Sequence, residues 1–214
     1  MAVADPTLDV ELELFAGGAS GVIGMDEVGR GAIAGPVAVG AAFVAAACGA
    51  FPAGLRDSKM LSEKARTAME PLAKEWVLFS SVGIASAAEV DEHGITACLG
   101  MAGRRALLEL HELGADVTGA VVLLDGNSDW LSTSLQRPLT ITTRVKADRD
   151  CASVAAASVI AKVHRDRMMI ELHTEQPGYG WLGNKGYGSP AHMDALRELG
   201  LTPHHRSSWL PAYA

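Results

Sequence analysis

Two adjacent carboxylates, Asp26 and Glu27, follow a short apolar run within residues 21–40, which read GVIGMDEVGRGAIAGPVAVG. Two like charges at the end of a buried strand repel each other and are costly to remove from water. A metal ion, a basic partner or abundant water could compensate them, and a divalent cation is the simplest of the three. The pair therefore indicates chemistry that depends on a bound cation.

Further carboxylates follow two other expected strands. Asp125 ends the apolar run AVVLL, and Asp148 lies just past the β-branched residues 140–145. Mg²⁺ takes oxygen ligands and keeps waters, so a few convergent carboxylates suit it. Zinc fits less well, because His204 and His205 are adjacent rather than spaced to share one face. We interpret these histidines as polar tail residues or phosphate contacts.

Each acidic residue also has a structural interpretation. Asp125 precedes Gly126 and could be an ordinary turn residue. Asp148 and Asp150 could cap the helix that starts near Cys151, and for Asp150 we prefer that interpretation. The Asp26 pair is harder to explain structurally, because strand alternation forces one of two adjacent side chains inward unless the backbone turns.

The turn formed by Gly29, Arg30 and Gly31 invites comparison with dinucleotide-binding loops. We reject this, because Gly35 comes one position too late for GxGxxG and the preceding carboxylates would repel a pyrophosphate. Glycines also let a ligand approach the main chain closely, and their polar backbone suits a hydroxyl group. We interpret the polar segment of residues 57–59 as a solvated connection on its pattern alone.

Alternating strand and helix patterns predict how these groups are positioned. Residues 21–28 and 37–43 read as a hairpin of two strands, and residues 77–86, 120–124 and 140–145 as three more. Helices are expected from the Ser62 N-cap to near Trp76, and over residues 90–113, 151–174 and 191–200. Because the run at 120–124 is continuously apolar, we expect a buried parallel strand there. The pattern predicts one compact α/β domain.

Composition narrows the class of protein. The chain has 214 residues, 49% of them hydrophobic, with 18 basic and 25 acidic side chains and a net charge of −7. Residues 144–167 hold six basic against three acidic side chains, so a basic face toward a polyanion is still expected. Three dispersed cysteines without a CxxC pair favour a reducing, cytoplasmic location. We see no secretory signal, and Pro36 and Pro52 argue against a membrane span in the uncharged residues 31–55.

Six motifs follow one another in the order found in ribonuclease HII, the bacterial type 2 ribonuclease H family, and the resemblance runs from about residue 24 to residue 209. The motifs are GMDEVGRGAIAGPV, LRDSKMLS, LLDGN, SVAAASVIAKVHRDR, NKGYGSPAH and LTPHHRSSW. The resemblance implies an α/β fold with a ribonuclease H-like central mixed sheet flanked by helices and a small C-terminal helical extension. It divides the chain into an arm at 1–20, a catalytic domain at 21–175 and an extension at 176–214 packed on that domain.

The same resemblance implies roles for individual residues. The metal-binding and catalytic carboxylates would be Asp26, Glu27, Asp125 and Asp148. Gly29, Arg30 and Gly31 resemble the segment that recognises a ribonucleotide 2′-hydroxyl, and Tyr187 resembles the tyrosine that works with it. Ser58 and Lys59 stand where the family contacts backbone phosphate. The departures are Met60 in place of a common lysine, Ala147 in place of a glycine, and Ser207 in place of a common arginine.

The implied activity is that of an endonuclease using two metal ions, Mg²⁺ or Mn²⁺. It would hydrolyse the RNA strand of RNA/DNA hybrids and nick 5′ of ribonucleotides embedded in duplex DNA, leaving 3′-hydroxyl and 5′-phosphate ends. Two alternatives stay open on the residues themselves: a carboxylate-metal nuclease indifferent to the sugar, and a hybrid-binding module without catalysis. We expect a monomer whose partners are these nucleic acids.

Overall fold

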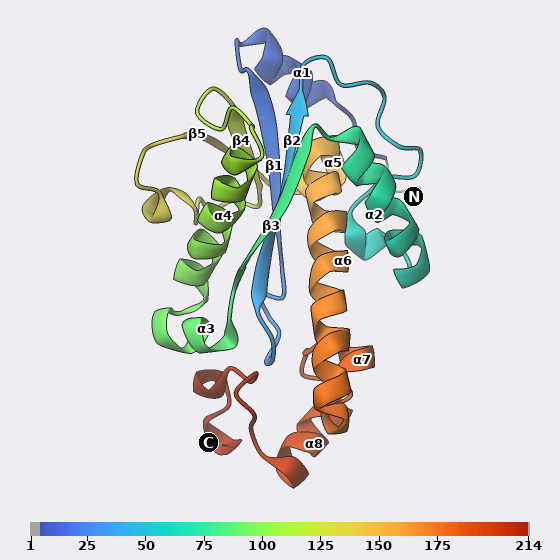
Figure 1. The fold of residues 1–214 in the computed structure, drawn as a ribbon, viewed down its shortest axis with the longest axis vertical. Coiled ribbons are helices and arrows are strands. Elements are labelled where there is room, and N and C mark those ends of the chain that lie inside the picture. Colours follow the sequence, from blue (N-terminus) through green and yellow to red (C-terminus); the bar gives the residue numbers. More distant parts are fainter. Residues whose placement is uncertain (1–4, 214) are drawn as a thin grey trace.

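A five-stranded mixed sheet forms the centre of the computed structural model, which describes residues 5–213 (Figure 1). The strands lie in the order β3 (Phe79–Ala85), β2 (Val37–Ala45), β1 (Gly21–Val28), β4 (Val121–Asp125) and β5 (Thr140–Arg144). The first three pair antiparallel, whereas β1, β4 and β5 run parallel. The predicted hairpin and the predicted parallel strand are both confirmed.

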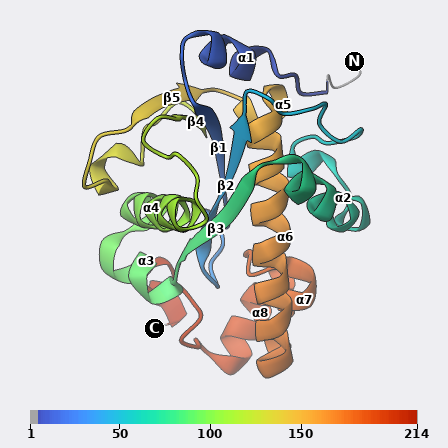
Figure 2. The same cartoon turned by 45° about the horizontal axis from the view of Figure 1, so that its top comes forward.

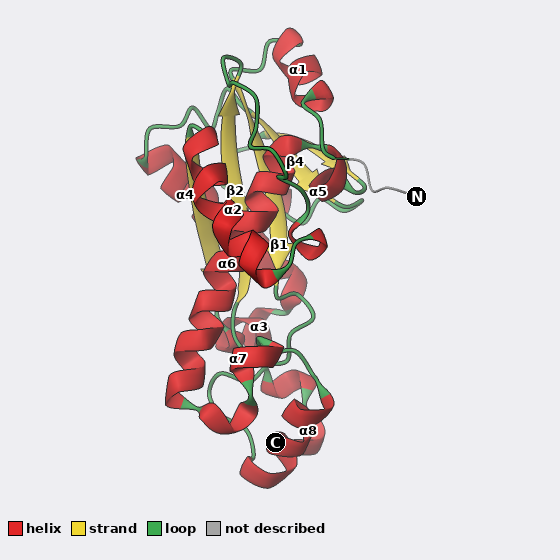
Figure 3. Cartoon of the chain, turned by 90° about the vertical axis from the view of Figure 1, so that its right-hand side faces the viewer, coloured by secondary structure: helices red, strands yellow, loops and turns green. Residues whose placement is uncertain are grey.

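Helices cover both sides of this sheet, and Figure 1 shows α4 on one side and α6 on the other. The helices are α1 (Asp9–Ala16), α2 (Glu63–Trp76), α3 (Ala87–His93), α4 (Ile95–Glu112), α5 (Ala147–Asp150), α6 (Ala152–Glu175), α7 (Trp181–Asn184) and α8 (Pro190–Leu199). In the side view of Figure 3, α7 and α8 gather at one end, below the sheet. This confirms the predicted fold class of a mixed sheet flanked by helices.

Side-chain alternation along β1 decides which side of the sheet each residue faces. Ile23 and Met25 pack in one core with the buried face of α4. Gly24 faces α6 instead, since a Cβ added there would lie 2.3 Å from the Ser153 carbonyl carbon. On β2, a Cβ at Gly40 would lie 2.4 Å from the Ala157 carbonyl oxygen. Glycine at both positions therefore lets α6 lie directly on the sheet.

The first half of α6 is buried all round rather than on one face, because the sheet, α2 and the N-terminal residues surround it. Every residue from 152 to 161 is buried. The small side chains that the sequence places there suit such close packing. This explains why an alanine-rich helix without a clear polar face can form here.

Two helix predictions need correction. The helix predicted over residues 90–113 is two helices, α3 and α4, which meet at Gly94 with φ of +78°. Glycine tolerates this left-handed conformation, so the chain can turn there without strain. The preferred interpretation of Asp150 as a cap for α6 is wrong, because its carboxylate instead accepts hydrogen bonds from Arg149. The start of α2 behind the Ser62 cap is confirmed, at 3.2 Å from Ser62 Oγ to the Ala65 nitrogen.

The N-terminal residues supply the missing cap of α6. Glu11 on α1 is fully buried, and its Oε1 accepts hydrogen bonds from the backbone nitrogen of Ser153 at 2.8 Å and from its hydroxyl at 2.6 Å. Thr7 adds two backbone hydrogen bonds, to the chain at Asp150 and Ala152. Figure 2 shows α1 at the same end of the molecule as the start of α6.

The C-terminal residues form a small core of their own around Tyr179, Trp181 and Leu196, which also includes Ala34 and Met169. The interpretation of His205 as a polar tail residue is wrong: it is buried, and its Nε2 lies 3.1 Å from that of His192. Between residues 5 and 213, no helix has the length and apolar character needed to span a membrane.

Candidate active site

Three carboxylates from distant parts of the chain meet at one place. Asp26, Asp125 and Asp148 each offer an oxygen atom, and these three atoms lie within 4.8 Å of one another. On the parallel strands β1 and β4, Met25 is the partner of Leu124, so the two following residues, Asp26 and Asp125, are neighbours. Asp148 reaches them from α5, after β5. The topology of the sheet thus produces the cluster.

The backbone around Asp148 is fixed to the same strand ends. Its N–H donates to Asp125 Oδ1 at 3.3 Å. The left-handed residue is Lys146, with φ of +63°, whereas Ala147 is a buried residue of α5 without a positive φ. The alanine that replaces the family's glycine therefore stands where the backbone does not require glycine.

The environment of two of these carboxylates, Asp26 and Asp125, disfavours their charge. Burial raises the pKa of Asp26 to about 8, although the nearby Lys59 opposes this. Burial, followed by the charge of Asp148, also raises the pKa of Asp125. A site that disfavours several negative charges gains from a bound cation, and oxygen ligands at this separation suit a hard divalent ion. The residues present therefore fit the metal that the resemblance implies.

Lys59 lies beside the cluster. Its Nζ donates to Asp148 Oδ2 at 3.0 Å, and its backbone N–H donates to Asp57 Oδ1 at 2.9 Å. Burial lowers the pKa of Lys59, but the carboxylates of Asp26 and Asp148 outweigh this and raise it above its ordinary value. The ammonium group partly compensates the acidic cluster and remains largely exposed.

The interpretation of residues 57–59 as a solvated connection is wrong. Asp57 and Ser58 are buried, and the Ser158 hydroxyl on α6 donates to Ser58 Oγ at 2.9 Å. This contact holds the segment against α6 and brings Lys59 to the carboxylates. The neighbouring Met60, which replaces the family's lysine, is exposed.

Glu27 lies outside the three-carboxylate cluster. Adjacent residues of a strand point to opposite sides, and Glu27 follows Asp26 on β1. One of its carboxylate oxygens lies 3.5 Å from the Arg30 guanidinium, as a partly exposed ion pair. Its role as a metal ligand stays a prediction.

The loop of residues 29–35, which we call the glycine loop, lies next to the segment that carries Tyr187. The backbone N–H groups of Ile33 and Ala34 both donate to the Gly186 carbonyl, at 2.9 and 3.0 Å. Arg30, Gly31 and the Tyr187 side chain are exposed. The residues expected to read a 2′-hydroxyl therefore come from two segments that are joined directly through their backbones.

Three charged residues with no exposed surface were missed as functional candidates by the reasoning from sequence: Glu11, Arg165 and Arg206. Both arginines are fully buried and donate to backbone carbonyls of the glycine loop. The expected basic face is also not formed as a unit, because Arg165 is buried and Arg167 pairs with Glu70. Arg165 lies in the charged segment KVHRDR of α6, so no local signal in the sequence sets it apart.

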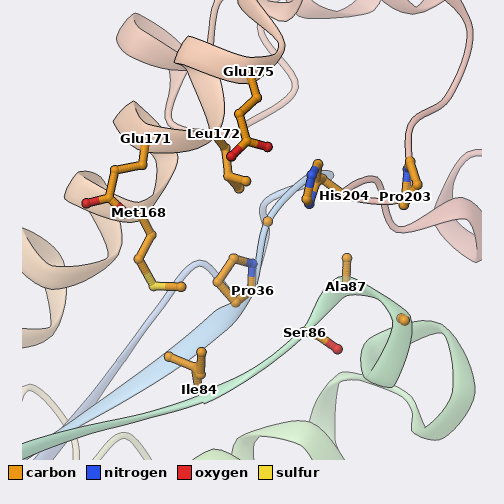
Figure 4. Close-up of a pocket in the computed structure, with 12 residues that line it drawn as sticks. Pro36, Ile84, Ser86, Ala87, Met168, Glu171, Leu172, Glu175, Pro203 and His204 are labelled. Carbon is orange, nitrogen blue, oxygen red and sulfur yellow. The ribbon is translucent and has the colours of Figure 1, made fainter.

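A hollow of about 340 Å³ lies elsewhere (Figure 4). Pro36, Ile84 and Leu172 line it with apolar side chains, together with Glu171 and His204. None of the predicted site residues lines it. The carboxylate cluster is at the strand ends beside an exposed lysine, outside this hollow.

Comparisons with known proteins agree with this geometry. The family model described as Ribonuclease HII matches residues 23–212. A ribonuclease HII of Streptomyces coelicolor is 46% identical over 205 residues, covering 95% of this chain and 83% of the relative. The solved ribonuclease H2 of Pyrococcus horikoshii OT3 superposes with a TM-score of 0.70 at 25% identity, over 88% of this chain and 93% of that one.

A second solved structure, Bst-RNase HIII in complex with Mn²⁺, is similar with a TM-score of 0.66 at 26% identity. The match covers 85% of this chain and 63% of that protein. The residues that the family model matches, 23–212, include all three carboxylates of the cluster.

Proposed function

The chain belongs to the ribonuclease HII family and is a metal-dependent endoribonuclease, and on this premise we propose that it nicks duplex DNA 5′ of embedded ribonucleotides. The proposal extends to the RNA strand of RNA/DNA hybrids, with the enzyme acting as a monomer. The convergence of Asp26, Asp125 and Asp148 is the observation that carries it. Ends with a 3′-hydroxyl and a 5′-phosphate are expected.

We assign the binding of two divalent cations, Mg²⁺ or Mn²⁺, to Asp26, Asp125, Asp148 and Glu27. When bound, such cations activate a water and stabilise the charge that develops on the phosphodiester. Asp26 would hold a cation with the others, because its burial makes an uncompensated charge costly. Lys59 donates to Asp148, and its exposed ammonium is available to bind a phosphate of the substrate. The contact of Ser58 with α6 fixes the backbone just before Lys59.

Selection of the sugar is assigned to Gly29, Arg30, Gly31 and Tyr187. The 2′-hydroxyl distinguishes RNA from DNA at a single position, so the enzyme reads it rather than using it as the nucleophile. An exposed aromatic ring such as that of Tyr187 can stack on the sugar or base beside it. Exposed backbone N–H groups in the glycine loop supply polar contacts at the same place.

A duplex with one ribonucleotide, incubated with Mg²⁺ or Mn²⁺, tests the proposal. We expect a nick on the 5′ side of the ribonucleotide and no cutting of the matched all-DNA duplex. Asp26→Asn should abolish the nick, whereas Asp116→Asn, at an exposed turn away from the cluster, should not. Absence of a nick with either metal contradicts the proposal. Equal cutting of both duplexes favours a nuclease indifferent to the sugar, and metal-independent binding without cutting favours a hybrid-binding module.

A further inference from the structure

Arg206 binds the carbonyl side of the glycine loop. Its Nη2 donates to the carbonyls of Gly29 at 2.7 Å and Gly35 at 3.2 Å, and its Nη1 donates to that of Arg30 at 2.9 Å. The side chain is fully buried, and within residues 5–213 no carboxylate forms an ion pair with it. The loop carbonyls, together with the Trp209 ring 4.8 Å from the guanidinium, therefore compensate a buried positive charge.

The two peptide groups that Arg206 binds differ from the rest of the loop. The Gly29 carbonyl shares a peptide unit with the Arg30 N–H, and the Arg30 carbonyl shares one with the Gly31 N–H. In the part of the chain that the structure describes, neither N–H has an acceptor, and both residues are exposed. By contrast, the N–H groups of residues 32–35 all donate to backbone carbonyls, namely those of Gly29, Gly186 and His204.

Arg165 fixes the loop from its other side. It donates to the carbonyls of Pro36 at 2.8 Å, Ala34 at 3.1 Å and Lys185 at 2.9 Å. Its guanidinium lies 5.6 Å from the centre of the Tyr187 ring. A Cβ at Gly29 would lie 2.1 Å from Arg165 Nε, so glycine is needed there for space as well as for its φ of +82°. A loop rich in glycine is thereby held in one conformation.

A charged donor on a carbonyl polarises the peptide group and strengthens the N–H on its other side as a donor, by about 10–30% per hydrogen bond in condensed-phase estimates. Arg206 does this for the Arg30 and Gly31 N–H groups, which have no acceptor within residues 5–213, and it holds their two peptide units in place. Burial lowers the pKa of Arg206 to about 10, so its charge is retained at neutral pH.

We propose that Arg206 is a specificity-determining positioning residue, which aims and polarises the Arg30 and Gly31 N–H groups as donors to the ribose 2′-oxygen. The inference rests on the proposed function, because it takes a ribonucleotide in duplex DNA as the substrate. Arg206 itself does not contact the sugar. Its effect is expected on the preference for ribose over deoxyribose, not on affinity for the duplex in general.

The test compares dissociation constants, without divalent cations, for a duplex with one ribonucleotide and for the matched all-DNA duplex. Arg206→Lys keeps a positive charge but offers one ammonium in place of the planar fork that binds both peptides. We expect the ratio of the two dissociation constants, which measures the preference for the ribonucleotide duplex, to fall about 3- to 10-fold. This corresponds to the loss of roughly one hydrogen bond to the 2′-oxygen. Affinity for the all-DNA duplex should not change.

Arg105→Lys is the matched control, because Arg105 also donates to a backbone carbonyl, that of Ile84 at 2.6 Å, which belongs to β3 and not to the glycine loop. It should leave the preference unchanged. A merely structural role of Arg206 would lower the melting temperature and leave the preference of the folded protein intact. That outcome, an unchanged preference in folded Arg206→Lys, overturns the inference.

Amide NMR of the wild-type protein supports or overturns the inference even where Arg206→Lys does not fold. The Arg30 and Gly31 amide protons should shift downfield with the ribonucleotide duplex and not with the all-DNA duplex; equal shifts with both overturn the inference. A wild-type protein that neither prefers nor cuts the ribonucleotide duplex contradicts the proposed function and the inference together. A wild-type preference that Arg206→Lys retains contradicts the inference alone.

Discussion

At the candidate site, the surroundings of individual side chains determine whether their charged forms are favoured. Asp26 is buried beside two other carboxylates, and its pKa is raised by that burial. Lys59 supplies one positive charge at 3.0 Å from Asp148 and so competes with a metal ion for the same oxygens. Elsewhere, buried histidines and arginines are held by neutral partners. The charge of each residue therefore depends on its neighbours. The direction in which substituting a neighbour changes metal affinity or folding stability can be predicted.

Lys59→Met should affect metal and nucleic acid in opposite directions. Removing the ammonium removes its repulsion of an incoming divalent ion, so we expect Mn²⁺ to bind about 3- to 10-fold more tightly. Loss of an exposed cation should weaken duplex binding by a similar factor. Calorimetric Mn²⁺ titration and a duplex-binding assay measure the two effects. Lys64→Met, on the exposed side of α2, is the control; equal effects of the two substitutions would contradict this role of Lys59.

His205 should make folding stability depend on pH. Burial, followed by the neighbouring His192, lowers its pKa from the ordinary 6.5 to about 4. As pH falls, the unfolded chain binds the proton first, so stability is fully present above about pH 6.5 and is lost toward pH 4. At about 1.4 kcal/mol per pKa unit, the loss is on the order of 3 kcal/mol.

Chemical denaturation between pH 4 and pH 7 measures this effect of His205. His205→Phe keeps an aromatic ring beside Tyr179 and Trp181 and should flatten the dependence. His111→Gln, at an exposed position of α4, should not. A pH dependence that is the same in His205→Phe and in the wild type would exclude His205 as its source.

Segments, rather than single residues, decide how the site is assembled. The α1 residues cap α6 through Glu11, and the Ser58 segment docks on α6 through Ser158. The first contact fixes the start of α6, which follows Asp148. The second fixes the residue that precedes Lys59. The role of the N-terminal residues could not be predicted, because a glutamate on a short helix shows no sign in sequence of a partner 142 residues away.

Glu11→Ala should destabilise the fold. It leaves the Ser153 N–H buried without its acceptor, at a helix end where a lost cap costs about 1–2 kcal/mol. Glu11→Gln keeps an acceptor oxygen and should retain most of the stability. Urea denaturation gives the comparison, with exposed Glu13→Ala as the control. If Glu11→Ala and Glu13→Ala unfold at the same urea concentration, the capping role is refuted.

Element prediction from sequence succeeded where a local signal existed. The Ser62 cap marks the start of α2, and the apolar run before Asp125 marks a parallel strand. It failed at Gly94, which reads as an ordinary glycine within a helical pattern but takes a positive φ and separates α3 from α4. The three carboxylates could be proposed together because each follows a recognisable strand. Arg206 could not, since only the folded chain brings it to the glycine loop.

At the scale of the whole molecule, the glycine loop joins the sheet to the C-terminal residues. Arg206 binds its carbonyls, and the Gly35 N–H donates to the His204 carbonyl at 2.8 Å. Asp26 and Glu27 lie near the end of β1, and the loop expected to read the sugar follows them directly. We therefore propose that part of the cutting site and the sugar-reading loop come from consecutive residues. The division of the chain at residues 20 and 175 stays a prediction.

Crystals of the protein soaked in Mn²⁺ test the central claim most directly, because anomalous scattering locates the ions without reference to activity. We predict anomalous peaks within coordination distance, about 2–2.5 Å, of carboxylate oxygens of Asp26, Asp125 and Asp148. Crystals of Asp26→Asn should lose them. Mn²⁺ peaks elsewhere on the protein, with none at these three carboxylates, would contradict the account.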